Sequence, residues 1–117
     1  MFAGGCLGGL ARYAVVRGWA APEGTFPWSV LVINCSGALV LGAVLTALPR
    51  SRDDLRALLG PGFCGAWTTF SAITVTVDQL ISNGHPATGL AYLGASAVGG
   101  LAAVCVGMAA GRRLAPC

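Results

Sequence analysis

The sequence contains no lysine, a single histidine and only four acidic residues among its 117 positions. Charged residues make up 9% of the chain and hydrophobic residues 56%, so there is too little polar surface to cover a soluble core. A chain of this length leaves room for one small domain, over residues 1–117. The composition therefore predicts a small membrane protein.

Several kinds of chemistry lack the residues that they need. The five cysteines form no Cys-x-x-Cys pair, and the only histidine, His85, lies between a glycine and a proline. Neither a zinc or redox centre nor a catalytic Ser/His/Asp or Cys/His set is expected. Five of the seven basic residues lie near the ends of apolar stretches, where topology determinants belong. We therefore expect neither an enzyme nor a nucleic-acid-binding protein.

Four stretches are long enough to cross a bilayer, since a helical span needs about 20 apolar residues. We expect helices at about residues 2–21, 27–48, 57–81 and 86–111. The first is the weakest because it contains Arg12 and Arg17, but its length and the lack of a small-residue cleavage site argue against a removable signal peptide. The predicted fold class is an all-α membrane protein with four transmembrane helices.

The arginines also predict the orientation. With a cytoplasmic N-terminus, at most Arg17 lies on the outer side, whereas five arginines lie on the cytoplasmic side: Arg50, Arg52, Arg56, Arg112 and Arg113. Cytoplasmic segments carry an excess of basic residues. We therefore expect a multi-pass protein of the cell membrane with both termini in the cytoplasm.

The third predicted helix contains residues that are poor membrane-helix formers. Its run from Gly62 to Ser71 includes Gly65 and the adjacent Thr68 and Thr69, within an uncharged segment. In hydrocarbon, backbone groups must be satisfied internally, so a broken helix is tolerated only where the freed groups line a cavity or hold an ion. We interpret this run as a site at a break near the middle of the helix.

Polar side chains inside the other spans add to this site. The amide donors of Asn34 suit an anion, although a structural bond between helices is the alternative. Arg12 either extends to the membrane interface or supplies positive potential at an anion vestibule. Four short helices enclose little volume, and small residues spaced four apart favour close helix contacts. An oligomer is therefore expected; the spaced pairs are Gly4/Gly8, Gly5/Gly9, Ala38/Gly42, Ser96/Gly100 and Gly107/Gly111.

Four motifs together resemble the Fluc/CrcB fluoride channels, over essentially the whole chain. They are Gly4-Gly5-x-x-Gly8-x-x-x-Arg12-Tyr13, Pro27-Trp28-x-x-Leu31-x-x-Asn34-x-x-Gly37, Gly62-x-x-Gly65-x-x-Thr68-Thr69-Phe70-Ser71 and Tyr92-x-x-x-Ser96. The resemblance implies passive fluoride export through two narrow pores in an antiparallel dimer. It places the fluoride pathway at Asn34, Phe70, Ser71, Ile73, Tyr92 and Ser96, with Arg12 at a vestibule. It also implies a central structural sodium ion, held by the backbone carbonyls of Gly65 and Thr68 from both subunits.

The chain departs from the family pattern at pore positions. Ile73 stands where a second phenylalanine is usual, Val30 where a threonine is usual, and Gly100 where a serine is usual. Together with the biased arginines, these changes favour pairing with a second subunit of the same family, although a homodimer is possible. A small multidrug exporter and a non-conducting membrane assembly subunit are the alternatives. The first is weakened because no acidic residue lies at membrane depth in the first helix.

Overall fold

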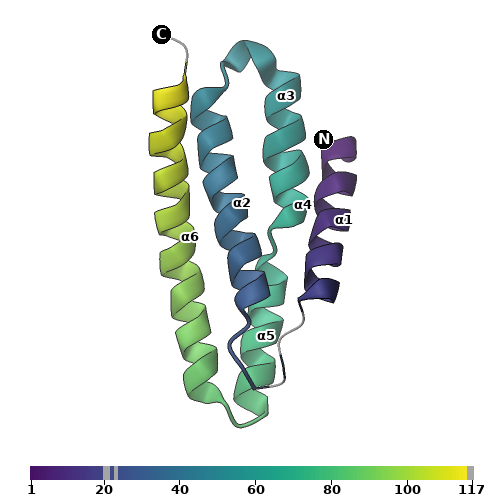
Figure 1. The fold of residues 1–117 in the computed structure, drawn as a ribbon, viewed down its shortest axis with the longest axis vertical. Helices are drawn as coiled ribbons and strands as arrows, with labels where there is room; N and C mark the ends of the chain where they lie inside the picture. Colours follow the sequence, from purple (N-terminus) through teal and green to yellow (C-terminus); the bar gives the residue numbers. More distant parts are fainter. Residues whose placement is uncertain (20–21, 23, 116–117) are drawn as a thin grey trace.

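The computed structural model describes residues 1–19, 22 and 24–115, and within these residues every regular element is helical. The expected all-α fold is confirmed. The helices form an elongated layer of 52 × 27 × 19 Å. Figure 1 shows α6 (Pro86–Leu114), α2 (Trp28–Ala47), the composite third helix and α1 (Phe2–Gly18) side by side. The N-terminal end of α1 and the C-terminal end of α6 point toward the same end of the long axis, as does the connection after α2 (Figure 1).

The most extensive helix pair is α2 with α6, and glycines allow its close approach. A Cβ atom on Gly107 would overlap the carbonyl oxygen of Leu39, and one on Gly111 would overlap Thr46. The Thr46 hydroxyl uses this proximity to donate to the carbonyl of Met108 at 3.2 Å. The pair Gly107/Gly111 therefore packs as the spacing predicts.

The other small-residue pairs divide into two groups. Gly4 and Gly8 of α1 lie directly on the carbonyl oxygens of Leu58 and Phe63 in the third helix. By contrast, a Cβ atom on Gly9 or on Gly100 would meet nothing within 4 Å. A side chain at either of these two positions would therefore not clash with the described part of the chain.

The third helix is assembled from several pieces. It begins with a 3₁₀ turn, Arg50–Arg52, followed by α3 (Asp53–Ala57), a π-helical segment Leu58–Cys64 and α4 (Gly65–Trp67). After a break it continues as α5 (Phe70–Ser82). The expected start at residue 57 is therefore about one turn late, because Asp53 and Asp54 in the first turn stabilise a helix N-terminus.

Two other boundaries also differ from the sequence expectation. α1 ends at Gly18, where glycine weakens the helix and the Trp19 N–H closes the last turn on Val15 at 2.8 Å; residues 20 and 21 lie outside the described residues. α6 continues past residue 111 to Leu114, because Arg112 and Arg113 in its last turn offset the negative end of the helix dipole.

Two helices of the described chain, α2 and α6, are by themselves long and apolar enough to cross a membrane. α1 has 17 residues and the third helix is interrupted, so neither meets the same criterion as a single helix. Large hydrophobic side chains nevertheless remain exposed along the layer, including Phe2, Leu10, Phe70, Val98 and Leu101.

Candidate functional site

The break in the third helix consists of two extended residues. Thr68 has φ/ψ of −81°/156° and Thr69 has −153°/117°, whereas Gly65 remains helical. The Thr68 hydroxyl donates back to the Cys64 carbonyl at 2.9 Å, and the Thr69 hydroxyl caps α5 by accepting the N–H of Ala72 at 3.2 Å. The two threonines therefore form the break by closing the helix ends on either side of it.

Asn34 of α2 bonds to both backbone groups of Thr69. Its Oδ1 atom accepts the Thr69 N–H at 2.8 Å, and its Nδ2 atom donates to the Thr69 carbonyl at 3.3 Å. In a continuous helix that N–H would bond to the carbonyl of Gly65, four residues earlier. The Asn34 side chain thus pairs the backbone N–H and carbonyl of Thr69 at the break. The Gly65 carbonyl is left without its usual helical donor.

Arg12 of α1 reaches the same break from the other side. Its Nη1 atom donates to the Thr68 carbonyl at 3.3 Å, and the side chain is half-buried. The guanidinium therefore lies within the helix layer. It places a positive charge beside the extended backbone.

Trp67 and Ser36 support the break, and the sequence analysis gave neither of them a role. The Trp67 indole donates to the Ser36 hydroxyl at 2.9 Å and stacks on Phe63 with ring centroids 5.9 Å apart. Gly37 admits Thr68 against α2, since a Cβ atom there would overlap the Thr68 methyl group. The sequence could have indicated this pair, because a tryptophan N–H that is removed from water needs an acceptor. Ser36, on the facing helix, is such an acceptor.

A groove of about 490 Å³ runs from the break along α1, α2 and α5. Its polar wall contains Arg12, Thr69, Ser71 and Thr76, and the Thr69 and Ser71 hydroxyls lie 3.1 Å apart. The remaining lining is mostly apolar: Gly9, Tyr13, Val16, Val30, Ile33, Ala72 and Val75. The groove therefore brings together two of the predicted site residues, Arg12 and Ser71, beside the break.

Tyr92 and Ser96, by contrast, do not line this groove. Both lie on α6 one turn apart, with their hydroxyl oxygens buried and without a hydrogen-bond partner among the described residues. The Tyr92 ring is fully buried and meets the ring of Phe26 edge-on, with centroids 5.6 Å apart. These hydroxyls form a second polar group that is separate from the groove.

The two predicted pore positions on α5 have opposite environments. Phe70 is 75% exposed, whereas Ile73, one turn later, is only 9% exposed. Within this chain, the Phe70 ring therefore projects from the helix layer and the Ile73 side chain belongs to its core.

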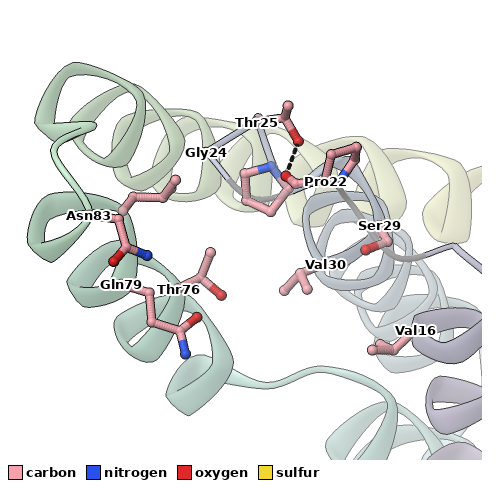
Figure 2. Close-up of a pocket in the computed structure, with 11 residues that line it drawn as sticks. Val16, Pro22, Gly24, Thr25, Ser29, Val30, Thr76, Gln79 and Asn83 are labelled. Carbon is pink, nitrogen blue, oxygen red and sulfur yellow. Dashed lines mark hydrogen bonds between the residues drawn. The ribbon is translucent and has the colours of Figure 1, made fainter.

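A second cavity, of about 270 Å³, lies where the groove approaches the α1–α2 connection. Val16, Val30 and Thr76 line both spaces. Figure 2 shows Ser29 and Val30 at the start of α2 facing Thr76 and Gln79 of α5 across this cavity. Polar side chains therefore continue from the break toward one end of the molecule.

The chain has clear relatives among known proteins. Residues 1–108 match the family described as "CrcB-like protein, Camphor Resistance (CrcB)". A "Fluoride-specific ion channel FluC" of Gloeobacter violaceus is 41% identical over 117 residues, which cover 95% of this chain and 92% of that protein. The protein with the same description from Rhizobium johnstonii is 38% identical, covering 96% and 93%. "Fluoride-specific ion channel FluC 2" of Streptomyces avermitilis is 40% identical over 80% of this chain, but the chain spans only 61% of its length.

Proposed function

The chain belongs to the CrcB-like family, and on that premise we propose that it is a subunit of a fluoride-selective channel that lets fluoride leave the cytoplasm passively. As a member of an ion-channel family it is a membrane protein, consistent with the apolar α2 and α6. We further propose that it crosses the cell membrane four times with both termini in the cytoplasm. The start of α1 and the end of α6 point toward the same end of the molecule as the arginine-rich connection after α2, which supports this topology (Figure 1).

The observation that carries the proposal is the break at Thr68 and Thr69. Asn34 and Arg12 bond to its backbone, and Arg12, Thr69 and Ser71 line the groove beside it. A small, strongly hydrated anion can enter a narrow pore only if donors replace its water. Asn34 uses one amide N–H on Thr69, and a primary amide has a second N–H to offer. The Ser71 hydroxyl and the Arg12 charge add donors and positive potential at the same depth.

A single chain supplies only part of a closed pathway. The groove is open along one face, and Phe70 projects from the layer. The positive ring edge of an exposed phenylalanine suits an anion held against a second subunit. We propose that an antiparallel partner closes the pore and that rearrangement at this interface gives the Tyr92 and Ser96 hydroxyls access to fluoride. A second subunit of the same family is the favoured partner, because the arginines bias insertion toward one orientation.

The break also fits the proposed structural sodium ion. The Gly65 carbonyl lacks its usual helical donor, since the Thr69 N–H bonds to Asn34, and Gly65 is exposed. The Thr68 carbonyl is the second candidate ligand, although Arg12 donates to it. Backbone oxygens suit a hard cation, and two subunits would double the set. Bound there, sodium would fix the two broken helices relative to each other.

Fluoride efflux from liposomes tests the proposed function. Vesicles loaded with potassium fluoride and containing the purified chain, alone or with its candidate partner, should release fluoride but retain chloride. Empty vesicles provide the control. An assembled protein that releases no fluoride in either form would instead favour the non-conducting assembly subunit, for which the apolar Ile73 and Val30 provide the argument.

A further inference from the structure

Four arginines from two distant parts of the sequence lie at one end of the molecule. They are Arg50 and Arg52 in the connection after α2, and Arg112 and Arg113 in the last turn of α6. All four are exposed. Within the described part of the chain, none of their guanidinium groups has a hydrogen bond or an ion pair. We refer to these four residues as the arginine face.

The close packing of α6 on α2 brings the two pairs to the same end. The Thr46 hydroxyl donates to the Met108 carbonyl at 3.2 Å, and Gly111 lies against Thr46. α2 ends one residue after Thr46. The last turn of α6 therefore lies beside the end of α2, next to the connection that carries the other pair (Figure 1).

The negative groups at this end do not balance the arginine face. Asp53 and Asp54 begin α3, and neither has an ion pair with a described residue. Arg56 covers the carbonyl end of α2, where its Nη1 atom donates to two carbonyls at 3.0 and 2.7 Å. The carbonyl end of a helix carries only about half a charge, whereas α6 ends with two arginines. Five arginines against two aspartates leave three positive charges, and residues 116 and 117, outside the described residues, include no acidic side chain.

We propose that the arginine face binds the headgroups of anionic phospholipids in the surrounding membrane. The planar guanidinium of arginine donates two parallel N–H bonds to a phosphate, which the ammonium of lysine cannot do. Every basic side chain of this face is an arginine, and the sequence contains no lysine. Groups of about four or more basic residues directly beside a membrane helix are typical of anionic-lipid sites.

The position of the face favours a lipid over a soluble anion. It lies at the ends of α2 and α6, the two described helices that are long and apolar enough to cross a membrane. Leu114, next to Arg113, is 75% exposed. A phospholipid matches both features, because its phosphate meets the arginines while its acyl chains cover apolar helix surface. A soluble anion matches only the charge. The proposal requires that the chain lies in a membrane, but not that it conducts fluoride.

A lipid titration of the purified, assembled protein in a neutral detergent tests the proposal. Phosphatidylglycerol should raise the melting temperature, whereas phosphatidylcholine should not. Arg50→Gln/Arg52→Gln and Arg112→Gln/Arg113→Gln should each raise the half-saturating mole fraction of phosphatidylglycerol about twentyfold, or about fivefold for each arginine. Arg17→Gln is the control, because Arg17 is exposed but belongs to α1 and lies outside the face. It should leave the half-saturating fraction unchanged.

Two results would overturn the arginine face. One is the same half-saturating fraction in both double variants, in Arg17→Gln and in the unmodified protein. The other is an equal rise of melting temperature with sodium phosphate at matched ionic strength, because the ligand would then be a soluble anion. If one double variant does not assemble, the other decides, since all four side chains are exposed and the proposal assigns both pairs to one face.

The outcome is independent of the proposed function. Selective binding of phosphatidylglycerol by a protein that releases no fluoride from liposomes would support the arginine face and contradict the channel. Fluoride release by a protein that does not distinguish phosphatidylglycerol from phosphatidylcholine would contradict the arginine face and support the channel.

Discussion

Asn34 bonds to both backbone groups of one residue, and this geometry determines what the break can offer to an ion. By accepting the Thr69 N–H, the amide oxygen takes the donor that the Gly65 carbonyl would otherwise receive. One N–H of the Asn34 amide bonds to the Thr69 carbonyl, and its second N–H remains to bind an anion. The two alternatives from the sequence, a structural bond and an anion donor, are therefore compatible in a single side chain.

Asn34→Asp separates these two roles. A carboxylate can still accept the Thr69 N–H, so the break and the assembled protein should persist. The same carboxylate donates nothing and repels an anion, and we expect fluoride efflux to fall by about a hundredfold or more. Liposome efflux measures this, with size-exclusion chromatography as the check on assembly. Normal efflux from an assembled variant would mean that the Asn34 amide lies away from the pathway.

Arg12 and the proposed sodium ion compete for one oxygen, the carbonyl of Thr68. Arg12→Gln removes a positive charge next to that oxygen, so sodium should stabilise the variant at about a tenfold lower concentration than it stabilises the unmodified protein. Melting temperatures in sodium chloride against choline chloride measure the effect. Arg17→Gln is the control, because Arg17 is exposed and lies over the Tyr13 ring rather than at the break. Equal sodium dependence in both variants and the unmodified protein would contradict the shared ligand.

At the scale of the helices, apolar length predicted α2 and α6 closely, because each is one uninterrupted helix. The third helix was less predictable. Glycine, threonine and serine together indicated where the helix is weak. The extended residues are Thr68 and Thr69, because their own side chains, Asn34 and Arg12 bond to the backbone groups that the break frees. The π-helical segment depends on Pro61, which has no N–H for a helical bond, and on glycine contacts with α1. Those contacts lie far apart in sequence, so a local pattern does not reveal them.

Glycine substitutions on α6 test whether close packing against α2 stabilises the layer. Gly107→Ala places a methyl group on the Leu39 carbonyl, whereas Gly94→Ala places one in open space. Both changes raise helix propensity equally, so their difference isolates the packing effect. We expect Gly107→Ala to be less stable than Gly94→Ala by about 1–3 kcal/mol. Thermal unfolding in detergent measures this, and equal melting temperatures would show that α2 and α6 separate at little cost.

At the scale of the whole molecule, the layer is too thin to enclose a pore. The shortest extent is 19 Å, about two helix diameters, and Phe70 projects from it while Ile73 is buried. An aromatic ring at the position of Ile73 would have to displace core side chains rather than extend toward a partner. In the proposed dimer, each chain would therefore offer Phe70 to the interface but no second aromatic edge. A partner with phenylalanine at both positions would supply what this chain lacks.

Expressing the chain alone and with such a partner tests whether the partner must supply the second aromatic ring. Because the proposed topology puts five arginines on one side and at most one on the other, the chain alone should insert in a single orientation. It then lacks an inverted copy, and we expect little fluoride efflux from it alone and efflux restored with a partner of opposite arginine bias. A protease-accessible tag at the C-terminus reports orientation in the same membranes. Full efflux from the chain alone, with its tag accessible equally from both sides, would establish instead a dual-topology homodimer in which isoleucine suffices at position 73.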